Sequence, residues 1–283
     1  MKKLLAALLV LALSAGACAA EDSGRLKQGN MAISNMSANE YIDFLHEGWR
    51  QNIWVYHKID MPEYSKYTAT DADIYNFDSF VDMIMALDSG KIDRIELMQP
   101  VGEYFLRMNA EKYITLAYTK AAIHYISMGF KEGSKWFEPF DAAIKAMNED
   151  DTLLFLKAKY VDYATEDLKP ITFEKFPDAE TVKIAVTGDL PPIDYIAADG
   201  TPAGFNTALL AEIGRRLKVN IELLNVNAGA RAAALSSGRA DGVFWFWYDK
   251  TSAKPRDVPA GVSLTEPYYT YDTFMYIGKK LHK

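Results

Sequence analysis

The sequence has very few of the residues that form disulfides or bind metals. Cys18 is the only cysteine among 283 residues, so no disulfide can form within the chain. The four histidines lie far apart and without metal-ligand spacing, at His46, His57, His124 and His282. The sequence also lacks a Gly-Xaa-Ser-Xaa-Gly elbow and a phosphate-binding loop. We therefore expect no metal site, no cofactor and no catalytic centre.

The N-terminal apolar run is too short to cross a membrane. It covers residues 4–13, whereas a transmembrane helix needs about 20 residues. It follows Lys2 and Lys3 and leads into small residues that end at Ala20, so residues 1–20 have the layout of a secretory signal peptide. We expect the protein to act in the periplasm or at the outer face of the cytoplasmic membrane.

Two interpretations of Cys18 stay open. Residues 15–18 resemble a bacterial lipobox, with Ala15 where Leu or a similar residue is usual, and an acylated Cys18 would anchor the protein through its buried lipid chains. Residues 17–19 suit an ordinary signal peptidase equally well. Cleavage after Cys18 would leave a mature protein without cysteine.

The chain has fewer basic than acidic residues. The chain has 31 Lys and Arg against 38 Asp and Glu, a net charge of −7, and loss of Lys2 and Lys3 with the signal peptide lowers it to −9. An acidic balance argues against nucleic acid or an anionic membrane as the partner. The composition is otherwise ordinary for a globular protein, with 49% hydrophobic and 24% charged residues.

One pattern of eight residues occurs twice. Residues 234–241 repeat the pattern of residues 86–93, in which a Leu that faces the core precedes a Gly and a basic residue. The Gly can adopt the left-handed conformation that ends a helix, and the basic residue suits the negative helix terminus. A strand is expected after each copy, at residues 94–97 and 242–247. Two copies predict two similar α/β lobes with a ligand in the cleft between them.

The remaining pattern alternates helices and strands. Ser37 and Glu40 form a capping box before one helix, and Pro100 opens another. Other strands are expected at residues 53–56, 122–126, 182–186 and 219–226, and other helices at 77–88, 137–147, 153–160 and 209–217. Residues 166–180 hold two prolines without periodicity, which is typical of a linker.

The C-terminal part resembles a known family. The positions that carry the resemblance are residues 182–186, Pro191-Pro192, Asp199-Gly200, Gly204-Phe205, Ala234-Leu235 with Gly238 and Asp241, Arg256, and Pro267-Tyr268. In this order they resemble the first lobe of the bacterial family 3 solute-binding proteins, the periplasmic receptors of polar amino acid ABC transporters. Residues 77–93, 129–133 and 140–160 are similar to the family's second half. The resemblance implies an α/β fold of two lobes, of the type II periplasmic-binding-protein-like class.

The two halves stand in the reverse of the family's order, which predicts a circular permutation. We expect a signal peptide over 1–20, a second-lobe segment with the family's C-terminal helices over 21–165, a linker over 166–180, and a first-lobe segment over 181–283. Fully extended, the linker would reach about 50 Å. It could therefore join lobes within one molecule, giving a monomer, or let two chains exchange lobes in a dimer.

The resemblance implies that Arg256 binds the ligand's carboxylate. A guanidinium holds a carboxylate through two hydrogen bonds and keeps its charge. The hydroxyl that usually lies three residues earlier is absent at Ala253, and Thr251 or Ser252 stands in for it. A solvent-exposed Arg256 is the other interpretation.

Other ligand positions depart from the family pattern. Leu190, Ile193 and Ala228 occupy positions that are commonly aromatic in the family, and Met98 stands where an acidic residue usually binds the ammonium group, with Glu96 and Gln99 nearby. A free amino acid would thus leave its positive charge poorly compensated in a closed cleft.

We call the two copies of the eight-residue pattern, residues 86–93 and 234–241, the octapeptides. The strand expected after the second octapeptide, at residues 242–247, is unusually aromatic. Trp245 and Trp247 are expected on one face, where with Tyr248 they would stack a ring or hold a cation. Core packing is the alternative. Asp189 is a further candidate for a polar group in the cleft, with a loop acid as the alternative.

Together these features predict an extracytoplasmic solute-binding protein. Its lobes would close on a small polar or carboxylate-bearing, amino-acid-like ligand and present it to an ABC permease or a membrane sensor. The alternative is a degenerate module that binds no solute and acts as an interaction or scaffolding lipoprotein. Some relatives on this fold are lyases, but the sequence offers no catalytic group, so we expect no enzyme.

Overall fold

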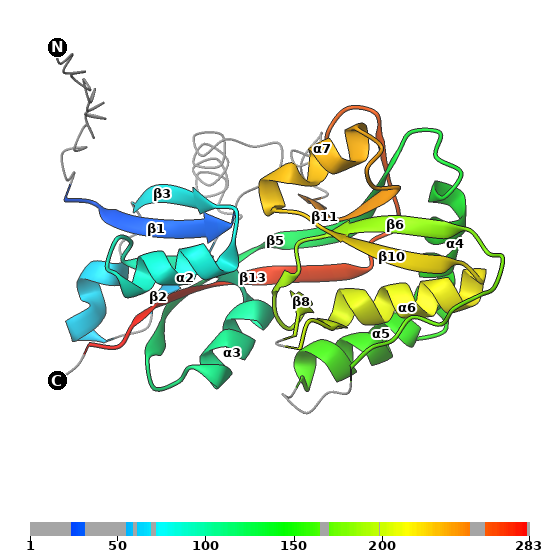
Figure 1. The fold of residues 1–283 in the computed structure, drawn as a ribbon. Helices are drawn as coiled ribbons and strands as arrows, with labels where there is room; N and C mark the ends of the chain where they lie inside the picture. The colour runs from blue at the N-terminus through cyan, green and yellow to red at the C-terminus, as the bar shows by residue number, and fades with distance from the viewer. Residues whose placement is uncertain are drawn as a thin grey trace, which may run out of the picture.

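The computed structural model describes residues 24–31, 55–58, 61–68, 72–164, 170–197, 199–249 and 258–281. One sheet of ten strands runs through two lobes in the order β10-β6-β11-β5-β13-β4-β1-β3, with β12 and β2 (Val55–Lys58) also paired to β5 (Figure 1). A separate sheet contains β7 (Asp189–Leu190), β8 (Asp194–Ile196) and β9 (Pro202–Ala203).

The two lobes have the same strand arrangement. Lobe A is built on β10 (Asn220–Asn225), β6 (Thr181–Val186) and β11 (Gly242–Asp249), and lobe B on β3 (Ala72–Phe77), β1 (Leu26–Met31) and β4 (Arg94–Met98). In each lobe the middle strand, β6 or β1, is parallel to both of its neighbours. The prediction of a mixed α/β fold with two similar lobes is confirmed.

Helices flank the sheet in both lobes (Figure 1). Lobe A has α4 (Phe137–Glu149), α5 (Thr152–Lys157), the π-helix η2 (Ala158–Asp162), α6 (Phe205–Leu217), the 3₁₀-helix η3 (Ala228–Ala230) and α7 (Arg231–Ser236). Lobe B has the 3₁₀-helix η1 (Pro62–Thr68), α2 (Phe80–Asp88) and α3 (Gln99–Met108). No helix in the described part of the chain is long and apolar enough to span a membrane.

Two long antiparallel strands join the lobes. β5 (Tyr113–Lys131) has 19 residues, about 60 Å at the usual rise, and pairs with β13 (Tyr269–Lys279) over most of its length. In lobe A, β5 also pairs with β11 and β12 (Val262–Leu264), and in lobe B β13 pairs with β4. The sequence predicted only residues 122–126 of β5, because the apolar pattern is interrupted where the strand passes between lobes.

The octapeptides form the same helix end in both lobes. Gly90 and Gly238 adopt φ values of 75° and 73°, as expected for a left-handed helix end. The Gly90 N–H donates to the Leu87 carbonyl at 3.2 Å, and the Gly238 N–H donates to the Leu235 carbonyl at 3.1 Å. The predicted helix, glycine turn and strand are therefore confirmed at both copies.

The last residue of each octapeptide fastens the middle strand of its lobe. Asp93 donates its N–H to the Lys27 carbonyl and accepts the Lys27 N–H on its carboxylate, both at 2.8 Å. Asp241 makes the same two bonds with Lys183, also at 2.8 Å. The octapeptide thus sets the register of the strand that follows it, β4 in lobe B and β11 in lobe A, beside the middle strand of the lobe.

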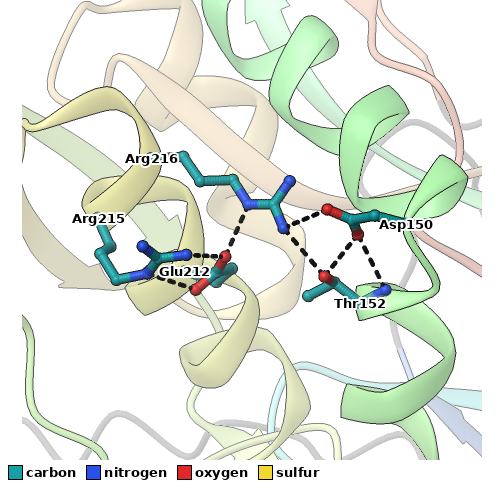
Figure 2. A network of polar contacts seen from close by, with 5 residues as sticks. All are labelled: Asp150, Thr152, Glu212, Arg215 and Arg216. Atoms are coloured by element: carbon teal, nitrogen blue, oxygen red, sulfur yellow. Dashed lines mark hydrogen bonds and ion pairs between the residues drawn. The ribbon is translucent and has the colours of Figure 1, made fainter.

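A polar network docks α4 and α5 onto α6 (Figure 2). The Arg216 guanidinium donates to the Asp150 carboxylate at 2.8 Å and to the Thr152 hydroxyl at 2.9 Å, and its Nε donates to Glu212 at 2.7 Å. Arg215 also donates to Glu212, at 2.6 and 2.9 Å. Residues 150 and 152 precede residues 166–180 and residues 212–216 follow them, so lobe A draws on segments from both sides of that stretch.

Residues 170–180, the described part of the predicted linker, lie against lobe A without forming a helix or strand. The Asn220 side chain accepts the Phe176 N–H at 3.0 Å and donates to the carbonyls of Phe176 and Ala179 at 3.0 and 3.1 Å. These bonds fix the segment at the start of β10. The predicted signal peptide and the predicted helix after Ser37 lie outside the described residues.

Candidate ligand-binding cleft

A cavity of about 140 Å³ lies between the lobes, which is room for a small molecule and not only for one or two waters. Both lobes and both crossing strands contribute to its walls. The lining residues are Asn30, Met31, Glu96, Leu97, Met98, Val101, His124, Ile126, Thr187, Leu190, Ala228, Arg231, Trp245, Trp247, Tyr271 and Phe274. Among the described residues, no group of three or more His, Cys, Asp or Glu is placed to hold a metal ion.

A buried carboxylate forms part of the lobe B wall. Glu96 on β4 is 6% exposed, and its two oxygens accept the side-chain N–H groups of Asn30 and Gln28 on β1, each at 3.0 Å. The Gln28 amide also donates to the Asn30 oxygen at 2.9 Å. Two neighbouring parallel strands therefore fix the orientation of one carboxylate at the cavity.

Arg94 supports this cluster from behind. It is almost fully buried, and its Nε donates to the Gln28 oxygen at 2.9 Å while an Nη donates to the Tyr67 carbonyl at 3.1 Å. Its guanidinium also lies over the Tyr276 ring, 4.4 Å from the centroid. The Gln28 amide thus connects a buried cation to the carboxylate of Glu96, so both charges are hydrogen-bonded, as buried charges require.

The lobe A wall contains a tryptophan in a rare backbone conformation. Trp245 has a φ of 73°, and the register between β11 and β5 shifts between Val243 and Phe246. The Asp194 carboxylate accepts the Trp245 indole N–H at 3.0 Å, and Arg231 donates to the Trp245 carbonyl at 2.6 Å. Such a conformation persists only when its surroundings hold it, and it is concentrated at functional sites.

Asp194 is the buried anchor of this bulge. Besides the indole, it accepts the Thr187 N–H at 3.1 Å and the Thr187 hydroxyl at 3.2 Å. Burial raises the pKa of the Asp194 carboxyl above its ordinary value, although the bonds from Trp245 and Thr187 oppose that shift.

Arg231 is a cavity residue that sequence reasoning missed. It opens α7 and is buried, and it donates to the carbonyls of Ala228 at 2.9 Å and Phe244 at 3.3 Å as well as to Trp245. A charged residue at the start of an otherwise apolar, alanine-rich helix was the available signal. Its described bonds tie three backbone carbonyls of lobe A together.

The crossing strands supply an aromatic floor. The His124 ring stacks on Tyr271 with centroids 5.1 Å apart, and lies 5.2 Å from Trp247 and 5.4 Å from Phe274. These four side chains come from β5, β11 and β13 and all line the cavity. Their faces and edges make the centre of the cleft aromatic.

Comparison with protein families identifies the C-terminal part of the chain. Residues 182–280 match the model of the bacterial extracellular solute-binding proteins, family 3. This part of the chain is similar to that family. The resemblance predicted from the sequence is confirmed, and the family is one of binding proteins. The matched segment supplies the lobe A wall and Tyr271 and Phe274 of the floor.

The chain is also similar to several solved structures, each at low sequence identity. The ligand-binding component of an ABC-type import system from Staphylococcus aureus is 15% identical, with a TM-score of 0.40 and coverage of 90% of this chain and 65% of that one. The periplasmic aliphatic sulphonate binding protein SsuA from Escherichia coli is 12% identical, with a TM-score of 0.37 and coverage of 89% of this chain and 64% of that one. The BvgS VFT2 domain from Bordetella pertussis is 9% identical, with a TM-score of 0.39 and coverage of 90% of this chain and 80% of that one.

The chain therefore spans slightly less than two thirds of the length of the first two structures. A comparison with curated proteins finds no match.

The structure brings some of the predicted site residues together. Trp245 and Trp247 both line the cavity. Tyr248 lies elsewhere, stacked on Tyr125 with centroids 5.5 Å apart, and contributes to a surface groove beside α4. Arg256 and Thr251, like Cys18, lie outside the described residues. Leu190, Ala228 and Met98, which the sequence analysis placed at ligand positions of the family pattern, all line the cavity.

Asp189 makes a contact between the two lobes. Its carboxylate accepts the N–H of Phe80, the first residue of α2, at 2.8 Å, and the Ala228 N–H lies 3.5 Å from the Asp78 carbonyl. Burial raises the pKa of the Asp189 carboxyl, and the nearby Asp194 adds to the shift. These contacts join β7 and η3 of lobe A to the start of α2 in lobe B, so the two lobes touch beside the cavity.

Proposed function

We propose that the protein is an extracytoplasmic solute-binding protein whose lobes close on a small polar or carboxylate-bearing, amino-acid-like ligand. The observation that carries the proposal is a cavity walled by both lobes and floored by the strands that join them. A hinged cleft of this kind holds a ligand between lobes that move as units. The family match of residues 182–280 supports the same function.

The partners and location follow from the same proposal. The ligand-loaded protein would be presented to an ABC permease or a membrane sensor. A secretory signal over residues 1–20, with Cys18 as a lipid attachment site if the lipobox interpretation holds, would place it in the periplasm or on the outer face of the membrane. Arg256 is proposed to bind the ligand's carboxylate, with Thr251 beside it.

A module that binds no solute remains the second candidate. The specific observation in its favour is that bulky aromatic side chains line the cleft. Trp245 in particular is only 7% exposed and firmly held, as a core residue would be. In that case the cleft is packing and the protein acts through its surface.

Ligand-dependent thermal unfolding distinguishes the two candidates. The mature protein, from Glu21 onward, is heated with amino acids, small carboxylates, amines and sugars. A ligand at a hundred times its Kd adds about 2.7 kcal/mol to the free energy of unfolding, which raises the Tm by several degrees. Arg256→Ala should abolish the shift for carboxylate ligands only. A cooperative transition that no compound moves would favour the module without solute.

We also propose that the chain is a circular permutant of the family. β13, which precedes lobe B in the family's order, ends next to β4, and β4 pairs with β1 at Gln28 and Arg94. A short loop from Leu281 to Gly24 would therefore restore the family's order. A chain that starts at Pro170 and carries this loop should unfold with a Tm within a few degrees of the original. Failure of this chain to form the same sheet would count against the permutation.

A further inference from the structure

The described lining of the cavity carries one acidic side chain and one Lys or Arg. The acidic side chain is Glu96 and the basic one is Arg231. Arg231 donates to the carbonyls of Ala228, Phe244 and Trp245, so its described hydrogen bonds serve the wall itself. Glu96 is therefore the charged group that can define the ligand's chemistry in this part of the cleft.

Glu96 is held in the way that a recognition group needs. The amides of Asn30 and Gln28 fix both oxygens, and these donors are themselves connected to each other and to Arg94. Each carboxylate oxygen has more than one lone pair, so it can accept a further donor from a ligand while it keeps its amide bond. An ordered carboxylate in a cleft that excludes water binds a cationic donor strongly.

Aromatic rings face the same cavity. Trp247, Tyr271 and Phe274 surround His124, and Trp245 is fixed by two hydrogen bonds. The face of a Trp or Tyr ring is negative, so it attracts a positive charge, and the same ring buries apolar groups. A carboxylate and several aromatic rings around one cavity favour a positive ligand with an apolar body.

We propose that this cleft binds a small organic cation, an amine with an aromatic or aliphatic body, whose positive nitrogen meets Glu96 while its body lies against the aromatic rings. This inference rests on the proposed function and refines it, because it names the chemical class that the described part of the cleft selects. A carboxylate on the ligand is not required.

The test uses three compounds of nearly equal shape that differ in charge. Benzylamine, benzyl alcohol and benzoate are each titrated into the mature protein at pH 8 by calorimetry, with tetramethylammonium as a cation that donates no N–H. Benzylamine should bind at least ten times more tightly than benzyl alcohol, and benzoate should bind more weakly still. Equal affinities for the three, or a preference for benzoate or benzyl alcohol, would overturn the inference.

Substitution at the carboxylate locates the site. Glu96→Gln keeps an oxygen that accepts the amide bonds but removes the charge, and it should weaken benzylamine binding at least tenfold while leaving benzyl alcohol unchanged. Glu103→Gln is the matched control, because it removes a carboxylate from α3 in the same lobe but outside the cavity, and it should leave benzylamine affinity unchanged. Equal loss in both variants would show a general charge effect and refute the site.

A second variant keeps the test informative if Glu96→Gln does not fold. Trp247→Leu keeps an apolar side chain but removes the ring, and it should weaken tetramethylammonium binding at least threefold. Unchanged binding would refute the aromatic part of the site. If amines fail while amino acids or carboxylates bind, this inference is wrong and the solute-binding function stands. If no compound binds, both are wrong.

Discussion

Replacing Gly204 by alanine should destabilise the protein by about 3–5 kcal/mol, near the upper end for a single substitution. Gly204 has φ 93° and ψ 179°, a region that is essentially restricted to glycine. A Cβ there would lie 2.6 Å from the Pro192 carbonyl oxygen and 2.7 Å from that of Ile193. Backbone atoms cannot move aside as the end of a side chain can, so the local fold must change.

The carbonyls of Pro192 and Ile193 lie close to Gly204 because they cap the N-terminus of α6. The Phe205 and Asn206 N–H groups, in the first turn of α6, donate to the same two carbonyls at 3.1 and 2.8 Å. These bonds satisfy donors that every helix leaves open at its N-terminus. Any side chain on Gly204 would therefore separate α6 from the groups that cap it.

Gly200→Ala is the matched control. Gly200 also has a positive φ, 83°, but a Cβ there would meet no atom within 4 Å. That variant should lose only the conformational cost of the left-handed region, about 1–2 kcal/mol. Chemical denaturation of the three proteins measures the difference. Similar losses in both variants would mean that the clash with the carbonyls is relieved without cost.

Replacing Asp194 by alanine should destabilise the protein by about 3 kcal/mol, because three donors then lose a buried acceptor. These donors are the Thr187 N–H, the Thr187 hydroxyl and the Trp245 indole N–H. Trp245 would also lose one of the two bonds that hold its rare conformation. Denaturation measures the stability, and the near-ultraviolet circular dichroism of tryptophan measures the order of the indole. An unchanged tryptophan signal would refute the anchoring role.

Asp194→Asn tests the charge separately from the hydrogen bonds. Burial raises the pKa of Asp194, so the folded protein binds its proton more tightly than the unfolded chain does. Stability from this group is therefore greatest at low pH and falls as the pH rises from about 4, the unfolded value, through the raised pKa. The asparagine cannot ionise, so the stability of the variant relative to the original should increase over this interval.

Asp199→Asn provides a control with the opposite sign. The Thr201 hydroxyl and N–H donate to the exposed Asp199 carboxylate and lower its pKa. The Asp199 carboxylate therefore stabilises the folded protein at pH values above the pKa of Asp in the unfolded chain, and this stabilisation is lost as the pH falls. The stability of Asp199→Asn relative to the original protein should accordingly decrease as the pH rises. Slopes of the same sign in the two variants would contradict the assignment of Asp194.

Local signals predicted the parts of the fold that local physics determines. The glycine turns of the octapeptides, the amphipathic helix before Asp88 and the helix opened by Pro100 all appear as predicted. Each depends on neighbours within about one helical turn, such as a cap or a left-handed glycine. The two-lobe arrangement followed because the same local unit occurs twice.

The features that the sequence did not predict depend on contacts between distant residues. The length of β5 is set by partners in both lobes, and its mixed polar and apolar pattern matches no single buried face. Trp245 and Trp247 were expected together by simple alternation, but the bulge that places Trp245 depends on Asp194 and Arg231, 51 and 14 residues away. Arg231, which no local pattern singled out, is a buried donor.

The position of β13 has a consequence for how the protein is made. β13 follows every other described element in the sequence, yet it lies in the middle of the sheet, between β5 and β4. Until it emerges, the two lobes have no common sheet, and β4 and β5 present unpaired edges that can associate with other chains. Chains that are cut short before Tyr269 should therefore be substrates for proteases and chaperones, and folding should be completed only when the last strand is present.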